Sequence, residues 1–543
     1  MMATARRGLT SAMAAALCLA ACPAAAQAPA NAAPKDSPIM AIPPIGPSAA
    51  QWRDSGGRAD MPVRRFVAQR KGVFDGERLS YRVIAEDQPL HDPGGAATGS
   101  IFAFSYIKDQ PAGAPQRPVL FVFNGGPGSS SVWLHMGIIG PRMASFRDVT
   151  PSQVPPFAVA DNPHSVLAAA DLVFVDPVGT GFSRYWGAGK PGDFYGREED
   201  AAASVRFINA WLRKHGRWNS PKFLLGESYG TTRVNLVARR LMGGFLDGTL
   251  KGASINGVIL LGGDGGLAQP KGNDHFRITF TTMAATAWYH GRADRAGRGF
   301  DQFIADADRF ARDRLVPALD QGTALAPQAM AQLAREHARF SGLDESYLVA
   351  KQLRIMPSDY RTGLLADQRL ELGHYDSRYT LPAQGTLGDP VADDPAMGQY
   401  SAPYIGAFNH YIRDDLGIDI DDDYVVIDWI NVNMPWNHGP RDEAAATPFV
   451  GGTGDPGGDL AAMMRRNPDL RLMSIQGWFD LFGAVGTAEY GIAQRRLPPE
   501  RVTAKAYWSG HMPYVGEAGP KMADDLKSFI RTASHPAPRE PQP

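Results

Sequence analysis

Cysteine is nearly absent from this sequence of 543 residues, which contains only Cys18 and Cys22. Both lie in an alanine-rich N-terminal segment, so we expect no disulfide in the folded part of the chain. Small exported domains often depend on disulfides, but a chain of this length can bury a core that makes them unnecessary. We therefore expect hydrophobic packing to stabilise the fold by itself.

A bias toward charge of one sign is also missing. The 55 basic residues balance the 56 acidic ones, and the formal net charge is −1. Such a chain has no basic field for nucleic acid or for an anionic membrane, so we expect neither as a partner. The metal motif H-E-x-x-H, the P-loop and the dinucleotide fingerprint are absent too, which predicts that the protein needs no metal and no cofactor.

No apolar run is long enough to predict a transmembrane helix in the mature chain. The apolar residues 9–21 follow two arginines, and this combination predicts an export signal over residues 1–26. Two cleavage sites are possible alternatives. Cleavage before Cys22 would make residues 1–21 a lipoprotein signal and Cys22 the site of a lipid anchor, whereas an ordinary signal peptidase would cleave at the end of the predicted signal. Either predicts an exported protein, periplasmic or secreted. The Ala- and Pro-rich residues 27–61 predict an unstructured linker.

The most informative motif is Gly-Glu-Ser-Tyr-Gly at residues 226–230. It lies between an apolar run, 223–225, and the helix-compatible residues 231–242, which is the strand, sharp turn and helix of a nucleophile elbow. Glycines flank the serine because the turn is strained and leaves no room for neighbouring Cβ atoms. Ser228 is therefore the predicted nucleophile.

A second glycine-rich loop follows another apolar strand. Residues 118–123 lead into Asn-Gly-Gly-Pro-Gly-Ser-Ser-Ser at 124–131. Successive glycines let backbone N–H groups turn toward a developing oxyanion, and the residue after the nucleophile supplies a further donor. We predict an oxyanion hole formed by the N–H groups of Gly126 and Tyr229. The alternative is an ordinary Gly/Pro/Ser turn.

Two further segments complete a pattern. The apolar run 171–176 leads into Pro-Val-Gly-Thr-Gly-Phe-Ser at 177–183, and Gly-His-Met-Pro occupies 510–513. Together with the two loops above, these segments resemble the serine carboxypeptidase family in composition and in order. The matching motifs span residues 118–235 and 470–515. The chain is thereby identified as a bacterial member of that family, within the α/β-hydrolase superfamily.

Chain order then predicts the other two members of a catalytic triad. In hydrolases of this fold the serine comes first in the sequence, the acid (Asp or Glu) second and the histidine last. Gly-Trp-Phe-Asp ends a late strand at 470–476 and matches the family's pattern, which makes Asp480 the predicted acid. His511 lies in a glycine-flanked loop after another strand. It would take the proton of Ser228 as general base and return it to the leaving group, while Asp480 orients its ring.

Other acids lie near these positions. Three aspartates precede the late strand and are open alternatives to Asp480: Asp455, Asp459 and Asp469. Asp176 precedes the nucleophile and belongs to a segment whose role in the family is structural. We expect Asp176 to be part of the scaffold.

Alternating strand and helix patterns predict an α/β-hydrolase fold, with a mostly parallel central sheet and helices on both faces. Residues 64–107 alternate apolar and polar side chains around turn signals and predict an antiparallel start. The core is expected over 62–273 and 465–534, interrupted by a mainly helical cap insertion, 274–464, that closes over the elbow. A disordered tail, 535–543, is expected to follow.

The resemblance implies that Asn124, Gly125 and Glu227 recognise the C-terminal carboxylate of a peptide, with Met512 as a further substrate-binding residue. The family has a second glutamate where this chain has Ile138. Two neighbouring carboxyl groups share a proton because their charges repel, so a lone Glu227 should ionise at lower pH than in a paired site.

An ionised Glu227 would repel a substrate carboxylate unless His135 or Arg142 compensates. We therefore expect carboxypeptidase activity that is weak relative to esterase activity and that lacks a strong preference for acidic pH.

The predicted function is a serine-type carboxypeptidase that hydrolyses C-terminal residues of peptides through a Ser-His-Asp acyl-enzyme mechanism. An esterase or acyltransferase on the same triad is an alternative, and a non-catalytic binding protein is a third. The oligomeric state is open, with a homodimer among the alternatives. Four side chains of the cap are expected to pack rather than to bind substrate: Tyr375, Arg378, Tyr379 and Tyr404.

Overall fold

The structure is a computed structural model that describes residues 63–145, 153–243, 252–384, 388–439 and 455–535. All of the described residues belong to one compact unit. The predicted export signal with Cys22, the linker and all but the first residue of the predicted tail therefore lie outside the described residues. Among the helices that are described, none has the length and apolar character that a membrane span requires.

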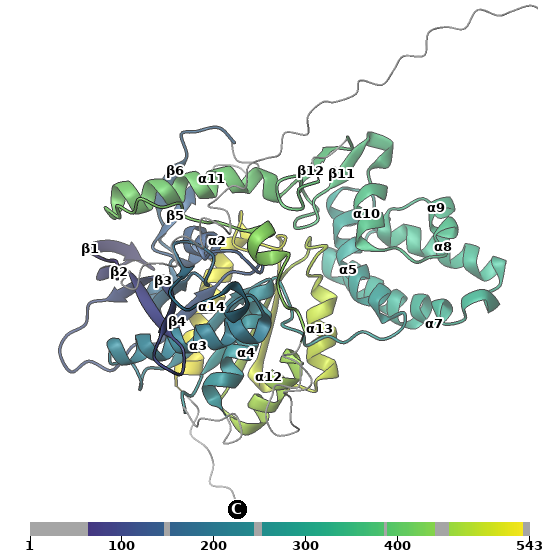
Figure 1. Cartoon of the computed structure of the whole chain (residues 1–543). Helices are drawn as coiled ribbons and strands as arrows, with labels where there is room; N and C mark the ends of the chain where they lie inside the picture. The colour runs from purple at the N-terminus through teal and green to yellow at the C-terminus, as the bar shows by residue number, and fades with distance from the viewer. Residues whose placement is uncertain (1–62, 146–152, 244–251, 385–387, 440–454, 536–543) are drawn as a thin grey trace, which may run out of the picture. The chain divides into compact units, whose positions relative to one another are not determined.

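Ten strands of the described chain form one sheet, in the order β1-β2-β3-β7-β4-β9-β10-β13-β14, with β8 beside β3 (Figure 1). Their bounds are β1 (Arg65–Phe74), β2 (Glu77–His91), β3 (Ala97–Lys108), β4 (Val119–Phe123), β7 (Asp171–Val175), β8 (Arg184–Tyr185), β9 (Lys222–Glu227), β10 (Gly257–Leu261), β13 (Arg471–Gly477) and β14 (Val502–Tyr507). Strands β1, β2, β3 and β7 pair antiparallel, and the strands from β7 to β14 pair parallel. This arrangement confirms the predicted α/β-hydrolase fold.

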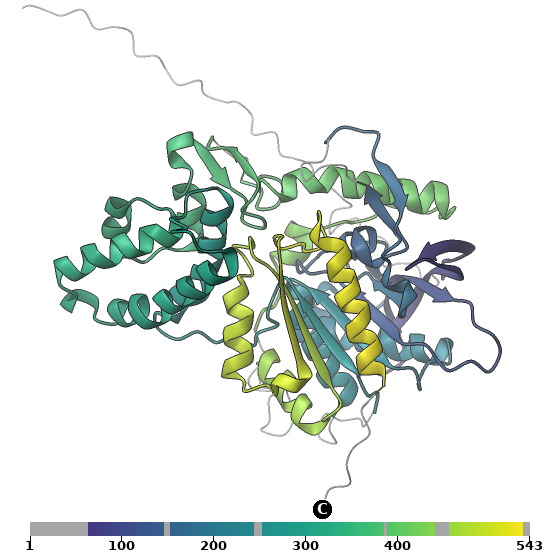
Figure 2. The ribbon, with the colours of Figure 1, turned by 180° about the vertical axis from the view of Figure 1, so that it is seen from behind.

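The central strands are buried on both faces because their side chains alternate between two layers of helices. Leu120 of β4 points into the apolar cluster that includes α14 (Ala518–Ser534), and its neighbour Phe121 points into the cluster of α3 (Arg197–Lys214) and α4 (Tyr229–Met242). Figure 1 shows α3 and α4 in front of the sheet, and Figure 2 shows α14 on the opposite face. Each such buried side chain contributes roughly 1.5–3 kcal/mol relative to an exposed one.

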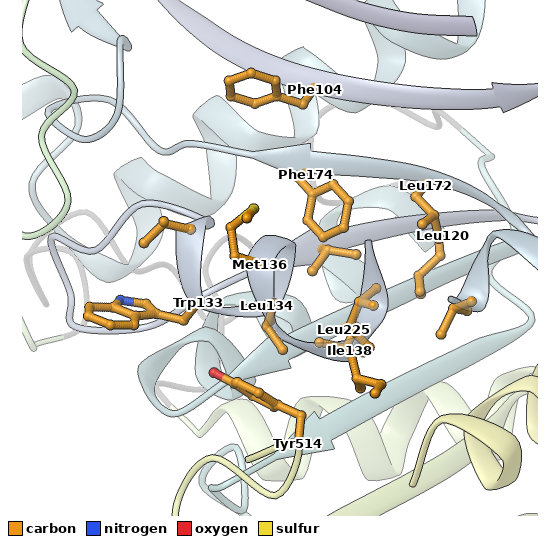
Figure 3. Close-up of a cluster of buried hydrophobic side chains, with 14 of the residues drawn as sticks. Phe104, Leu120, Trp133, Leu134, Met136, Ile138, Leu172, Phe174, Leu225 and Tyr514 are labelled. Atoms are coloured by element: carbon orange, nitrogen blue, oxygen red, sulfur yellow. The ribbon is translucent and has the colours of Figure 1, made fainter. Parts of the chain in front are cut away.

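Helix α2 (Val132–Leu134) and the turn η2 (His135–Ile139) fill the space beside the central strands. Figure 3 shows Leu134 and Ile138 among the sheet residues and close to Tyr514. Ile138 is 2% exposed and belongs to the cluster on the α14 side. The position that holds an acid in the resembled family is therefore part of the hydrophobic core here.

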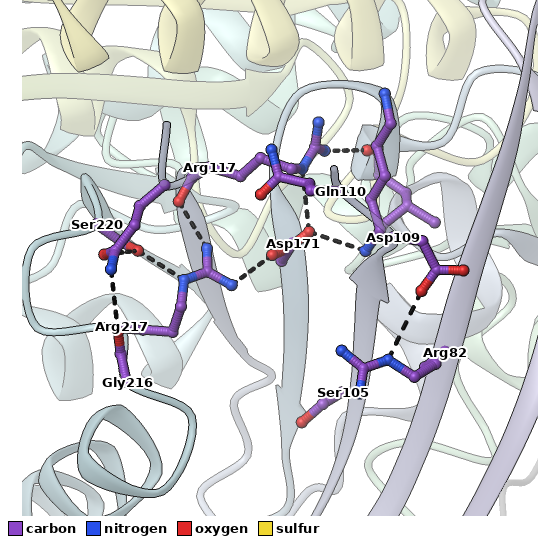
Figure 4. Close-up of polar contacts among 12 residues, drawn as sticks. Arg82, Ser105, Asp109, Gln110, Arg117, Asp171, Gly216, Arg217 and Ser220 are labelled. Atoms are coloured by element: carbon purple, nitrogen blue, oxygen red, sulfur yellow. Dashed lines mark hydrogen bonds and ion pairs between the residues drawn. The ribbon is translucent and has the colours of Figure 1, made fainter. Parts of the chain in front are cut away.

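A buried carboxylate fixes the start of the parallel strands (Figure 4). Asp171, the first residue of β7, is 1% exposed and accepts hydrogen bonds from Arg117 Nε at 3.1 Å and Arg217 Nη1 at 2.6 Å. The backbone N–H of Lys108 donates to the same carboxylate at 3.1 Å. Because a buried charge is tolerated only when it is paired, this cluster holds the ends of β3, β4 and β7 together.

Between β10 and β13 the chain leaves the sheet for a helical region with an apolar cluster of its own. The elements are α5 (Asp274–Tyr289), α6 (Phe300–Phe310), η6 (Ala311–Leu315), α7 (Val316–Leu319), η7 (Gly322–Ala324), α8 (Pro327–Ser341), α9 (Glu345–Ala350), α10 (Pro357–Gly363), η8 (Ala366–Gln368), β11 (Leu370–Leu372) and β12 (Thr380–Pro382). The cluster also takes in Phe479 and Leu481, which follow β13. The helical region is thus anchored directly beside the predicted catalytic acid.

The next part of the predicted insertion packs on the sheet instead. Tyr404 and Phe408 of α11 (Met397–His410) belong to the cluster on the α14 side. Helix α12 (Pro456–Arg466) contributes to the cluster of α3 and α4, so residue 464, the predicted end of the cap, lies inside a helix that packs with the core. The bounds of the cap stay a prediction.

The remaining short elements connect these parts. They are β5 (Arg142–Ser145), β6 (Ala158–Asp161), η3 (Val166–Ala168), η4 (Pro191–Asp193), η9 (Tyr411–Asp415), η10 (Trp429–Asn433), α13 (Val485–Gln494) and η11 (Pro499–Arg501).

Candidate active site

Ser228 lies at a sharp turn between β9, which ends at Glu227, and α4, which begins at Tyr229. Its backbone has φ 58° and ψ −126°, a conformation that costs a non-glycine residue roughly 1–3 kcal/mol. An ideal Cβ on Gly226 would lie 2.0 Å from the carbonyl oxygen of Gly230, so only glycine fits there. This is the geometry of the predicted nucleophile elbow.

His511 and Asp480 form a buried hydrogen-bonded pair. His511 Nδ1 lies 2.7 Å from Asp480 Oδ2, and the two residues are 4% and 0% exposed. The other carboxylate oxygen of Asp480 accepts from the N–H groups of Phe482 at 2.9 Å and Gly483 at 2.8 Å. Burial by itself would lower the pKa of His511, but the charge and hydrogen bond of Asp480 raise it above its ordinary value of 6.5.

The nucleophile and this pair lie on the same edge of the sheet. The Ser228 N–H donates to Leu261 O at 2.9 Å, at the end of β10. An ideal Cβ on the next residue, Gly262, would lie 3.2 Å from His511 Cε1, and one on Gly263 would lie 3.1 Å from Ser228 O. The described residues contain no hydrogen bond between Ser228 Oγ and His511, a contact that in hydrolases often tightens only when substrate binds.

The loop after β4 lies against the elbow. An ideal Cβ on Gly125 would lie 2.7 Å from Ser228 Cβ and 2.8 Å from Tyr229 N. The N–H of Gly126 donates to no backbone acceptor among the described residues, and Tyr229 is the first residue of α4, where N–H groups lack intrahelical acceptors. Both N–H groups predicted for the oxyanion hole are therefore free to donate.

A buried arginine, Arg233, holds the loop after β4 in place. Arg233 of α4 is 0% exposed, donates to the backbone oxygen of Asn124 at 2.5 Å and pairs with Asp200 of α3 at 2.6 Å. Because both helices and the loop share one guanidinium, the oxyanion loop is fixed relative to the elbow. Sequence reasoning missed Arg233 and Asp200, since neither lies in a motif.

Glu227 is a second buried acid beside the nucleophile. It is 4% exposed, and its Oε2 accepts from Asn124 Nδ2 at 2.7 Å and from the Tyr514 hydroxyl at 2.9 Å. Burial raises the pKa of Glu227 to about 7, although His511, Tyr514 and Asn124 each lower it. Burial thus raises the pKa of Glu227 without a second acid at position 138. The expectation that Glu227 ionises at lower pH than in a paired site stays a prediction.

The two side chains proposed to compensate for that acid lie elsewhere. His135 is fully buried, stacks on Phe174 and shares a hydrogen bond of 2.5 Å with Tyr106. Burial lowers the pKa of His135 to about 3, so it carries no charge at neutral pH. Arg142 pairs with Asp161 at 2.5 Å and Asp415 at 3.2 Å. The structure gives neither residue a contact with Glu227, and the proposed compensation is wrong.

Met512, the remaining predicted substrate-binding residue, is 4% exposed and belongs to the hydrophobic cluster on the α14 side. Its side chain packs with that cluster next to His511 in the chain. A contact between Met512 and the substrate stays a prediction.

Three of the alternative acids have partners away from His511. Asp176 is buried and accepts hydrogen bonds from Ser131 and Tyr424, as expected of a scaffold residue. Asp455 caps α12 and pairs with Arg495, and Asp459 pairs with Arg239. His511 therefore finds its partner in Asp480.

Of the four cap side chains expected to pack, three do so away from His511, and Tyr375 contacts it. Tyr379 and Tyr404 are buried, and Arg378 pairs with Asp376 and donates to Trp508 O. Tyr375 contacts the catalytic pair: its carbonyl oxygen accepts from His511 N at 2.6 Å and its ring centroid lies 5.2 Å from that of His511.

Phe482 is an exposed residue that contacts the ring of His511, and sequence reasoning did not single it out. Its ring centroid lies 5.5 Å from that of His511, and the residue is 56% exposed. The two rings are nearly perpendicular, with an interplanar angle of 88°. The described residues contain no group of three or more His, Cys, Asp or Glu side chains arranged for a metal ion.

Comparison with known proteins agrees with this site over part of the chain. The sequence model of the serine carboxypeptidase family matches residues 98–295, the segment that carries the oxyanion loop and the elbow. Two Caenorhabditis elegans proteins, serine carboxypeptidases ctsa-3.1 and ctsa-3.2, are 26% identical over 190 residues and 24% identical over 192 residues. The matches cover 32% and 34% of this chain and only 28% and 32% of those relatives.

Solved structures with a related chain path include a prohormone-processing carboxypeptidase from Saccharomyces cerevisiae, KEX1(Δ)p. It is 14% identical, with 82% of this chain and 91% of that chain covered and a TM-score of 0.48. A lipase in its open form is 15% identical, with 83% and 99% covered and a TM-score of 0.32. The fold assignment rests on the strand order and the elbow.

Proposed function

We propose that this chain is a serine carboxypeptidase, which cleaves the C-terminal residue from peptides. The observation that carries the proposal is Glu227: a buried carboxyl group with a pKa of about 7 that directly precedes Ser228 in the chain. A hydrolase needs the triad and the oxyanion hole for any acyl substrate, whereas a buried carboxyl that can hold a proton next to the nucleophile suits a site that binds an anionic group.

The chemistry follows from the positions of the side chains. His511 accepts the proton of the Ser228 hydroxyl as the oxygen attacks the scissile carbonyl, and Asp480 holds the imidazolium through Nδ1–H. The N–H groups of Gly126 and Tyr229 stabilise the resulting oxyanion. His511 then gives its proton to the leaving amine, and water releases the acyl group by the same steps.

Recognition of the C-terminus is assigned to the group around Glu227. In its neutral form the Glu227 carboxyl can donate a hydrogen bond to the substrate carboxylate, and Asn124 is held beside it at 2.7 Å. Gly125 lies directly against the elbow, where an ideal Cβ would be 2.6 Å from Glu227 O and 2.7 Å from Ser228 Cβ, so the loop that carries Asn124 is held close to the nucleophile. Once Glu227 ionises, its charge repels the substrate, because like charges in a buried site cannot both be accommodated.

The test compares three substrates that differ only at the C-terminus: a blocked dipeptide acid, its amide and its methyl ester. A carboxypeptidase favours the acid in kcat/KM at pH below about 7, the pKa of Glu227. Equal or better turnover of the amide and ester at every pH would make the protein an esterase or acyltransferase on the same triad. No turnover of any of the three would exclude a catalytic role for the site.

The origin and location of the protein are also proposals. The N-terminal pattern of arginines, an apolar run and small residues supports a bacterial protein exported to the periplasm or secreted, with lipidation of Cys22 as one alternative. Metabolic labelling with a fatty acid, compared between the natural chain and Cys22→Ala, distinguishes lipidation from ordinary cleavage.

A further inference from the structure

Tyr514 occupies an unusual position next to the carboxyl group of Glu227. Its hydroxyl lies 2.9 Å from Glu227 Oε2 and 3.1 Å from Oε1, so one O–H donor serves both oxygens. Tyr514 is 4% exposed and comes from the loop between β14 and α14. The triad already has its own acid in Asp480, so this second carboxyl group with its phenol partner serves another purpose.

The arrangement is built into the fold. An ideal Cβ on Gly137 of η2 would lie 2.6 Å from Tyr514 Cδ2, so the Tyr514 ring lies directly against a residue that has no side chain. The other donor is fixed as well, because Asn124 Oδ1 accepts from Leu134 N at 3.2 Å. Both donors to Glu227 are therefore held in place before any substrate arrives.

The groups that act electrostatically on Glu227 come from several elements. The charge of His511 favours its ionised form, and the charge of Asp480 opposes it. Tyr404 of α11 also interacts with Glu227 through space. Tyr514 differs from these groups because it combines direct hydrogen bonding with a pKa that burial raises well above 10, so it stays protonated across the working range.

We propose that Tyr514 is a specificity-determining partner of Glu227, which sets the pH above which the site stops accepting a peptide carboxylate. The inference rests on the proposed function. The phenol is a hydrogen-bond donor that stays protonated across the working range, so recognition of the substrate carboxylate depends on one proton, that of Glu227. Because the hydroxyl donates to the ionised carboxylate, it favours loss of that proton and limits peptide cleavage to lower pH.

Removing the Tyr514 hydroxyl should change the pKa of Glu227 in a defined direction. In Tyr514→Phe the ionised form of Glu227 loses a donor, so the pKa of Glu227 rises. The pH at which kcat/KM for a blocked dipeptide acid declines should move up by about one to two units, the equivalent of one hydrogen bond to a charged group. The decline should not move for the dipeptide amide, because a neutral C-terminus needs no proton on Glu227.

The experiment measures kcat/KM from about pH 5 to 9, a range around the ordinary His pKa and that of Glu227, for the acid and the amide in the natural enzyme and Tyr514→Phe. Tyr507→Phe is the matched control, since it loses a phenol that donates to Asp525 and not to Glu227. An upward shift for the acid alone, in Tyr514→Phe alone, supports the proposal. A uniform loss for both substrates with unchanged pH dependence would overturn it in favour of a structural role.

A second measurement separates this inference from the proposed function. Infrared difference titration of the natural protein against Glu227→Gln follows the carboxyl proton whether or not a peptide acid is a substrate. If the midpoint rises in the Tyr514→Phe background while no peptide acid is cleaved, Tyr514 controls Glu227 but the carboxypeptidase function fails. If the midpoint stays unchanged, the proposed role of Tyr514 is wrong, even in an active carboxypeptidase.

Discussion

Asp480 binds His511 Nδ1 with one carboxylate oxygen, at 2.7 Å, while its other oxygen accepts two backbone N–H groups. The residues on either side of it, Phe479 and Leu481, are buried in the cluster of the helical region. The predicted catalytic acid is therefore held from both sides, by hydrogen bonds within its turn and by packing of the helical region.

Asp480→Asn should keep this geometry and lose the charge that stabilises the imidazolium. The amide can also favour the wrong tautomer of His511, so we expect kcat to fall by about 10⁴-fold with little change in KM. Asp455→Asn is the control, because that side chain caps α12 and pairs with Arg495 rather than with His511. Equal kcat for natural enzyme and Asp480→Asn would remove Asp480 from the triad.

Ser228→Ala should abolish acyl transfer without unfolding the protein. The side chain is partly exposed at the tip of the elbow, so its removal leaves the core unchanged. Residual turnover, from the oxyanion hole and binding, should be on the order of 10³-fold over water. Ser401→Ala in α11, where the hydroxyl only bonds Met397 O, serves as the control for loss of a serine. Native circular dichroism together with retained activity would show that another residue is the nucleophile.

Glu227→Gln should remove the pH dependence of carboxylate recognition. In the natural enzyme the preference for a dipeptide acid over its amide should fall as pH rises through about 7, because Glu227 is neutral below that pKa and charged above it. Glutamine cannot ionise, so the preference in the variant should be the same at every pH. The ratio of kcat/KM values for acid and amide reports this directly. A ratio that falls with pH in both proteins would assign the titration to another group.

The arrangement of the predicted triad could be expected from the sequence because each of its residues follows a strand. Ser228, Asp480 and His511 come after β9, β13 and β14, and the carboxyl ends of parallel strands meet at one edge of the sheet. A local motif at a strand end therefore fixes the position of a side chain almost as well as the structure does. The fold class followed from the same alternation of strands and helices.

The surroundings of Glu227 could not be predicted in this way. Tyr514 is separated from Glu227 by 287 positions in the chain, and no periodicity connects them. His135 and Arg142 are near Asn124 in sequence, but the turn η2 directs His135 into the core and β5 places Arg142 beside Asp161. Burial of Glu227, which controls its proton, is a property of tertiary packing and has no local signal.

The stability of the sheet should depend on the buried carboxylate at the start of β7. Arg217 donates to Asp171, to Arg117 O and through Nε to Ser220, each between 2.6 and 2.7 Å. Arg217→Met keeps most of the side-chain volume but leaves Asp171 with Arg117 as its single guanidinium partner. Because hydrogen bonds to charged groups each contribute about 1.5–3 kcal/mol, we expect the free energy of unfolding to fall by about 2 kcal/mol. Urea unfolding measures the change.

The control for that experiment is Arg213→Met, a nearby exposed arginine of α3. It carries the same change of charge and side chain without a buried acid to pair, so its unfolding free energy should stay within about 0.5 kcal/mol of the natural protein. Equal destabilisation by both substitutions would attribute the effect to net charge. Neither substitution should alter the pH dependence of peptide cleavage, since Asp171 lies at the amino end of its strand and the catalytic residues follow the carboxyl ends of theirs.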